Sequence, residues 1–298
     1  KVNQVNKTSD KITNSSNKKI CHYVKNKVNY GCGLGHNFGY KVCLKNNFKF
    51  IARIDNDMIL SKKLLYHLVK RMENNPQIVA LNPKIMFAQK PNLIWFRGTK
   101  IGNNLKLQKQ CAAYTPGHKD SKNFRGLVTT DAIVGCASIM RADRLKKVGL
   151  SDPDFFYGEE DIELSQRLKD GNDSLIVDLN HKIYHFVSAT VGTNWAKTIY
   201  YNYKYRLLLI KKIGTFSDKF FGYSICIIKL LISSMLIFNL KDSSRIIQRY
   251  YGIKHFYQKK YGKYDRKNYT KINNFFKKID KKTNIVDVIN VIFGKRKI

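Results

Sequence analysis

One part of the chain alternates between strand-like and helix-like patterns, and this succession constrains the fold most. FKFIARI (48–54) is a short apolar run followed by the acidic turn Asp-Asn-Asp, and it predicts a buried strand. SKKLLYHLVKRMENN (61–75) places its Leu, Val and Met side chains on one helical stripe. QIVALNPKIMF (77–87) predicts a second strand. A strand, a helix and a strand in this order predict a parallel sheet with helical crossovers, and hence an α/β fold.

Similar patterns continue to about residue 214. We expect strands at 132–140 and 174–186, and helices at 141–149, 159–170 and 194–214. The segment before them, 98–126, has the composition of a loop. The chain therefore predicts one α/β domain over residues 1–215.

The character of the chain changes after residue 215. Residues 220–240 carry a single charge, Lys229, and are long enough to cross a bilayer. The central lysine and several polar residues leave a helix that lies in the plane of the membrane, or one that is partly buried, as an equal alternative. Residues 241–298 hold 17 Lys and Arg against 4 Asp and Glu, a net charge of +13. We expect residues 216–298 to form a second region that is helical, basic and membrane-associating.

The basic character of the whole chain points to an anionic partner. Its 55 Lys and Arg face 21 Asp and Glu, which gives a formal net charge of +34. About half of this excess matches the Lys, Asn and Ile usage of an AT-rich genome. The rest favours a nucleic acid, a membrane face or an acidic substrate. No RNP-like, zinc-finger or helix-turn-helix pattern is present, so nucleic-acid binding is the weaker alternative.

Two carboxylates follow the first predicted strand. Asp55 and Asp57 would lie at the end of a buried strand, where open α/β sheets bind ligands. Their spacing lets a tight turn present both to one hard cation, Mg²⁺ or Mn²⁺. Such a cation would offset the charge of a diphosphate. The alternative is a solvated turn without a ligand.

A cluster of acids opens the predicted helix 159–170. The helix dipole and the free N–H groups of a first turn stabilise carboxylates there. An aromatic run, Phe155 to Tyr157, precedes the cluster. A carboxylate beside aromatic rings loses solvation, which raises its pKa and makes it a better base. We therefore expect one acid to take part in chemistry, and we expect Glu159 to lie on an exposed turn. The cluster consists of Glu159, Glu160, Asp161 and Glu163.

Several of these segments, taken in order, resemble a known family. ARIDNDMIL, GCASIMRADRLKKVGLSDPDFFYGEEDIELSQRL and VDLNHKIYHF resemble family-2 glycosyltransferases of the GT-A fold, most of all the subgroup that includes bacterial rhamnosyltransferases. NYGCGLGHNFGY (29–40) and NWAKTIYYNYKYRLLLI (194–210) are similar to other segments of that family. The resemblance covers about residues 3–212. It implies a Rossmann-like mixed sheet flanked by helices, the fold of nucleotide-diphospho-sugar transferases.

The resemblance also implies a metal site. Asp55 and Asp57 match the family's D-x-D motif, with Asp57 as the more direct ligand of Mg²⁺ or Mn²⁺. His185 matches a histidine found near the diphosphate or the metal. A histidine in a strand, satisfied by its neighbours, is the alternative for His185.

Other residues would serve the sugar. Asp161 matches the general base of inverting members of the family. Asp131 matches an acidic position near the acceptor or donor sugar, and Glu160 joins Asp55, Asp57 and Asp131 among the residues expected to bind the donor. For Arg167, we expect a salt bridge at the surface or within its own helix.

The implied activity is inverting, metal-dependent transfer of one hexose from a UDP- or dTDP-sugar to a hydroxyl of a glycan or lipid-linked acceptor. We expect this in cell-surface polysaccharide synthesis at the cytoplasmic face of the plasma membrane, with peripheral or single-span attachment. A Q-x-x-R-W motif of processive synthases is absent, which favours a non-processive enzyme.

One departure leaves a further alternative open. The family begins with an apolar strand that holds the nucleotide base, and no apolar run precedes residue 20. The first strand is therefore expected to be missing. A catalytically inactive, truncated relative that acts as a membrane-associated scaffold is the alternative function.

Overall fold

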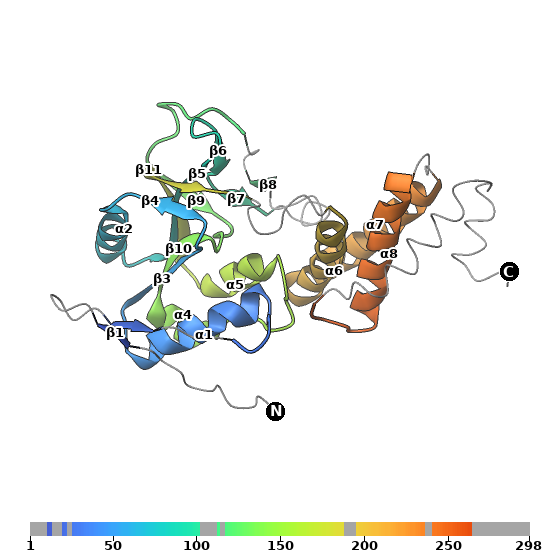
Figure 1. Ribbon diagram of the computed structural model, residues 1–298, viewed down its shortest axis with the longest axis horizontal. Coiled ribbons are helices and arrows are strands. Elements are labelled where there is room, and N and C mark those ends of the chain that lie inside the picture. Colours follow the sequence, from blue (N-terminus) through green and yellow to red (C-terminus); the bar gives the residue numbers. More distant parts are fainter. Residues whose placement is uncertain are drawn as a thin grey trace.

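The computed structural model describes residues 11–13, 20–22, 26–101, 112–113, 117–187, 195–235 and 240–263. Its centre is a seven-stranded mixed sheet with helices on both faces (Figure 1). The main path of the sheet is β3–β10–β5–β11–β4, with β6 paired to β5 and β9 paired to β11. The strands are β3 Phe50–Ile54, β4 Met58–Leu60, β5 Ile78–Phe87, β6 Ile94–Phe96, β9 Leu127–Thr130, β10 Ala137–Arg141 and β11 Ser174–His185.

Two short antiparallel pairs lie outside this sheet. They are β1 Lys11–Thr13 with β2 Ile20–His22, and β7 Thr99–Lys100 with β8 Ala112–Ala113. The described helices are α1 Cys32–Lys45, α2 Leu64–Glu73, α4 Ala142–Val148, α5 Glu160–Leu168, α6 Trp195–Ile213, α7 Phe216–Met235 and α8 Leu240–Tyr257.

The predicted strand–helix–strand unit is present as β3, α2 and β5, but its strands are not neighbours. β10 lies between β3 and β5 and is antiparallel to both. The parallel neighbour of β5 is β11. The sheet is therefore mixed, as the family resemblance implied, and not the purely parallel sheet that the local pattern indicated.

The strand predicted at 132–140 begins only at Ala137, for a physical reason. The N–H groups of three preceding residues donate to side chains instead of to a neighbouring strand. The acceptors are Ser165 Oγ for Ile133, Asn82 Oδ1 for Val134 and Asp161 Oδ2 for Gly135, at 2.8–3.0 Å. Apolar composition predicted a strand here, but these long-range hydrogen bonds hold a loop.

Side chains that alternate along the strands build two cores. Ile139 and Leu81 face α2, whereas their neighbours Met140 and Ala80 face α1, α4 and α5. The sheet thus separates two apolar layers. The loop 133–135 and the first turn of α5 lie on the side of the sheet that faces α1.

A third core joins α6, α7 and α8 at one end of the molecule (Figure 1). Tyr200, Tyr201 and Tyr205 of α6 are buried there together with Phe155, which precedes α5. The boundary predicted near residue 215 falls in the short link between α6 and α7. Within the described residues, we find no helix that combines the length and the apolar character needed to cross a bilayer.

Candidate active site

The end of β3 meets the first turn of α5 through one ion pair. Arg53 Nη2 lies 2.6 Å from Asp161 Oδ1, and the N–H of Gly135 donates to Asp161 Oδ2 at 2.8 Å. Arg53 Nε donates to the carbonyl of Gly135, and Arg53 Nη1 lies 3.4 Å from Tyr40 Oη. Both carboxylate oxygens of Asp161 therefore accept hydrogen bonds, which fix the orientation of the carboxylate.

Arg53 itself is shielded from solvent, with only 9% of its side chain exposed. Burial alone would lower its pKa, but Asp161, Tyr40 and Glu160 raise it above the ordinary value. The guanidinium thus stays charged and fixes the position of Asp161. Local sequence patterns gave no signal for Arg53 or Gly135, because their contacts span 13 to 108 positions of the chain.

Glu160 differs from the other acids of the cluster because no ion pair or side-chain hydrogen bond stabilises its charged form among the described residues. It is buried, and its Oε2 atom has no hydrogen-bond partner among the described residues. Burial, reinforced by the charge of Asp161, raises the pKa of Glu160 to about 8. Arg53 opposes the shift without cancelling it. Glu160 is therefore protonated at neutral pH or close to exchanging its proton.

The other two acids have structural partners. Glu159 forms an ion pair with Arg206 of α6 at 2.7 Å, and both side chains are largely buried, which corrects the expected exposed turn. Burial raises the pKa of Glu159, and Arg206 opposes the shift. Glu163 accepts from Arg167 at 2.7 and 2.8 Å, which confirms the predicted salt bridge on the same helix.

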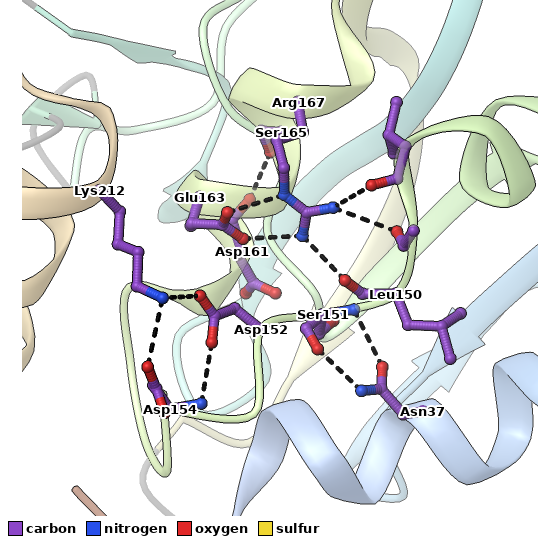
Figure 2. A network of polar contacts seen from close by, with 12 residues as sticks. Asn37, Leu150, Ser151, Asp152, Asp154, Asp161, Glu163, Ser165, Arg167 and Lys212 are labelled. Atoms are coloured by element: carbon purple, nitrogen blue, oxygen red, sulfur yellow. Dashed lines mark hydrogen bonds and ion pairs between the residues drawn. The ribbon is translucent and has the colours of Figure 1, made fainter.

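Arg167 also ties α5 to the loop before it. Its guanidinium donates to the carbonyls of residues 148–150 (Figure 2). In the same network, Asn37 of α1 exchanges two hydrogen bonds with Ser151, and Lys212 of α6 contacts Asp152 (Figure 2). The loop that leads to the acid cluster is therefore fastened to three helices.

The three residues predicted to hold a metal come close to one another. β4 pairs antiparallel with β11 in a register that sets His185 opposite Met58, so His185 lies beside the turn after β3. His185 Nε2 lies 3.5 Å from Asp57 Oδ1. Burial raises the pKa of Asp55; Arg53 lowers it, and the charges of Asp161 and Asp57 raise it further. These acids therefore share one electrostatic environment.

The donor atoms at this place fit a hard cation. Asp57 Oδ1 and His185 Nδ1 are buried and have no hydrogen-bond partner among the described residues. Carboxylate oxygens are the ligands that Mg²⁺ and Mn²⁺ prefer. As the side chains stand in the described part of the chain, no three His, Cys, Asp or Glu side chains form a complete metal-binding group. Asp55, Asp57 and His185 thus remain a predicted set.

Asp131 is held at another place. Its Oδ2 accepts from the N–H of Ile101 at 2.8 Å, and Lys169 Nζ lies 3.9 Å from its Oδ1. Gln166 donates to its backbone carbonyl. None of these contacts joins Asp131 to the metal set or to Asp161. In this structure, Asp131 connects the residues after β7 to the last turns of α5.

One face of α1 brings three residues to the acid cluster that were not predicted from the sequence. Cys32, His36 and Tyr40 are spaced by four positions and so share a helical face. Burial raises the pKa of Cys32 to about 12, and Glu160 and Asp161 add to the shift. Burial lowers the pKa of His36, and Arg53 lowers it further. The four-residue spacing was the available signal that this face is a unit.

Glycine lets the start of α1 approach the aromatic run. Gly31 has φ +85°, and a Cβ atom on it would lie 2.2 Å from the carbonyl of Phe156. The N–H of Cys32 donates to that same carbonyl at 2.8 Å. The aromatic run therefore positions α1 and the acid cluster together.

Two comparisons with known proteins found a similarity, and a third found none. The family model for "Glycosyl transferase family 2" matches residues 5–149. No curated protein matches the chain. A similar solved structure is "Crystal structure of GalNAc-T7 with UDP, GalNAc and Mn2+", with 12% identity and a TM-score of 0.48 over 78% of this chain and 44% of that chain. The chain thus spans less than half of that protein's chain. The matched segment, residues 5–149, contains β3 and the loop with Gly135 and is thus similar to glycosyl transferase family 2.

Proposed function

We propose that this chain is an inverting, metal-dependent glycosyltransferase of the GT-A fold, which moves a sugar from a nucleotide-sugar donor to a hydroxyl group. One observation carries the proposal. Arg53 pairs with Asp161 from a position two residues before Asp55, so the acid cluster of α5 and the predicted metal set lie at one site. The family match of residues 5–149 supports the same reaction class.

The donor would bind at the end of β3, with Asp55, Asp57 and His185 as ligands of Mg²⁺ or Mn²⁺. Asp57 Oδ1 supports this assignment, because this buried oxygen accepts no hydrogen bond among the described residues and lies 3.5 Å from His185 Nε2, so a bound cation would satisfy it. When bound, the cation offsets the negative charge of the departing diphosphate.

Asp161 is the proposed general base. It takes the proton of the acceptor hydroxyl while that oxygen forms its bond to the anomeric carbon. The bond to the nucleoside diphosphate breaks on the opposite face of the sugar, which inverts the anomeric centre without a covalent enzyme intermediate. Arg53 and the N–H of Gly135 orient the carboxylate for this step.

Glu160 is a second candidate for the base. Its raised pKa and its unpartnered oxygen favour proton exchange near neutral pH, whereas both oxygens of Asp161 are engaged. The two residues are adjacent, so the choice changes which carboxylate faces the acceptor and leaves the location of the site unchanged.

We further propose a UDP- or dTDP-linked hexose as donor and a glycan or lipid-linked hydroxyl as acceptor, with one sugar added per encounter. The setting would be cell-surface polysaccharide synthesis at the cytoplasmic face of the plasma membrane. The net charge of +34 supports an acceptor embedded among anionic lipids.

An inactive relative is the second candidate function. The specific observation in its favour is that Arg53 and Gly135 already hold both oxygens of Asp161, whereas a general base must contact the acceptor hydroxyl. In that case the site would bind a nucleotide-sugar without turning it over.

The experiment is to measure transfer and hydrolysis of UDP- and dTDP-hexoses with Mn²⁺, with Mg²⁺ and with EDTA. Asp57→Asn should abolish turnover and weaken metal-dependent nucleotide binding. Asp143→Asn is the matched control, because Asp143 is an exposed acid on α4. Metal-dependent nucleotide binding without turnover in the wild type would favour the inactive relative. Activity of Asp57→Asn in EDTA equal to that of the wild type with metal would reject the metal site.

A further inference from the structure

α7 exposes an unusually apolar face. Seven large apolar side chains on it are exposed, from 42% for Ile227 to 86% for Phe216. At 100° per residue they cover roughly half of the helix circumference. We call them the α7 stripe: Phe216, Phe220, Phe221, Ile227, Ile228, Leu231 and Ile232.

The opposite face of α7 packs against α6 and α8. Cys226 is buried in the core that α7 shares with α6 and α8. Asp218, the one acidic residue of α7, is also buried, and its carboxylate accepts from the N–H and the hydroxyl of Thr215. The α7 stripe therefore lies on the face of α7 that the core does not cover. α7 itself lies at the end of the molecule distant from the sheet (Figure 1).

One polar group on this face, the hydroxyl of Ser224, needs little water. Ser224 lies between the apolar side chains, and its hydroxyl donates to the carbonyl of Phe220 at 2.8 Å. The stripe is thus apolar over four turns, and its central hydroxyl is satisfied within the helix. Contiguous apolar surface of this kind marks a protein or membrane contact.

Charge decides between the occupants. α7 carries no acid on its exposed face, and the following segment 241–298 has a net charge of +13. A second copy of a chain with a net charge of +34 would be repelled. A bilayer with anionic lipids instead attracts nearby lysines and arginines. A helix with one wide apolar face and basic neighbours is the kind that lies in a membrane interface.

We propose that α7 docks in the plane of an anionic bilayer, with the α7 stripe inserted among the lipid headgroups and acyl chains. The occupant is the lipid surface, and α6 and α8 remain on its aqueous side. This assignment is independent of glycosyl transfer, because it rests on the exposed side chains and the charge of the chain.

The test is sedimentation of the full chain with vesicles of phosphatidylcholine, with and without phosphatidylglycerol. The wild type should bind the anionic vesicles and bind the neutral ones weakly. The triple variant Phe220→Ser, Ile227→Ser, Leu231→Ser should bind the anionic vesicles at least ~10-fold more weakly than the wild type, since each buried apolar group adds to interfacial binding. Phe48→Ser is the control, because Phe48 is 56% exposed and lies before β3.

Two measurements keep the result interpretable. Thermal unfolding should be alike for the wild type and both variants, because all the changed side chains are exposed. Sedimentation equilibrium without lipid reports self-association. Wild-type binding by the triple variant would overturn the proposal, because the basic residues alone would then account for it. The proposal would also be overturned if the wild type formed a dimer, did not bind vesicles, and lost the dimer in the triple variant. The α7 stripe would then be a contact between two copies of the chain.

Discussion

A Cβ atom on Gly135 would lie 0.4 Å from Nη2 of Arg53. The guanidinium thus occupies the space in which any other residue at position 135 would place its side chain. That same guanidinium holds Asp161, so a missing side chain in one loop positions a carboxylate on α5.

We therefore predict that Gly135→Ala displaces Arg53 and, with it, Asp161. A shift of about 1 Å at a reacting group costs roughly 10²-fold in rate. Overpacking should also lower the free energy of unfolding by about 1–3 kcal/mol. Initial rates and denaturant unfolding measure the two effects. Gly39→Ala is the control, because a Cβ atom there meets nothing within 4 Å. Normal activity of Gly135→Ala would show that Arg53 does not position Asp161.

Asp161→Asn and Glu160→Gln together identify the base. Loss of a general base costs roughly 10²–10⁴ in rate, whereas donor binding should persist in Asp161→Asn. Asp161→Asn is expected to show the larger loss in turnover, because Asp161 is the oriented carboxylate. The measurement is kcat with nucleotide affinity for each variant. A dead Glu160→Gln beside an active Asp161→Asn would transfer the role to Glu160.

The pKa of Glu160 predicts how stability depends on pH. The folded-state pKa is raised from 4.5 to about 8, so folding favours the protonated form. This contribution is complete below the pKa of the unfolded chain and is lost as the pH rises through about 8. Glu160→Gln should therefore reduce the fall in unfolding free energy between about pH 5 and 9. Urea unfolding across this range measures the slope, with Asp143→Asn as control. An unchanged slope in Glu160→Gln would contradict the prediction.

Arg206→Met should destabilise the chain more than the double variant Glu159→Gln, Arg206→Met. Removing one partner of a buried ion pair leaves an uncompensated charge and costs about 3–5 kcal/mol, whereas removing both avoids that cost. The two side chains are 11% and 15% exposed, so solvent screens them only in part. A double-mutant cycle of unfolding free energies provides the measurement. Additive effects would mean that the pair contributes no coupling.

The sequence predicted elements well wherever one apolar pattern decides the structure. The helix at 141–149 is α4, Ala142–Val148, and the strand at 174–186 is β11, Ser174–His185. The proximity of Asp57 and His185 was also foreseen, although only through family resemblance. The ion pair of Arg53 with Asp161 was not foreseen, because its partners are 108 positions apart and neither has a local pattern that names the other.

The prediction that Glu159 is exposed was wrong for a similar reason. Its place before a helix indicated an exposed turn, but α6, which follows about 40 residues later, covers it and supplies Arg206. Residue 159 also has φ +70°, a conformation that non-glycine residues seldom adopt. Neither the cover nor the backbone conformation can be read from neighbouring residues.

The ion pair between Glu159 and Arg206 has a mechanical consequence. Glu159 adjoins Glu160 and Asp161, and Arg206 belongs to the helix that packs against α7 and α8. A tilt of these three helices relative to the sheet must therefore stretch this pair or bend the loop that ends at residue 159. Either deformation would displace the adjacent carboxylates of Glu160 and Asp161 first. Movement of the three helices is therefore coupled to the acid cluster through a single ion pair.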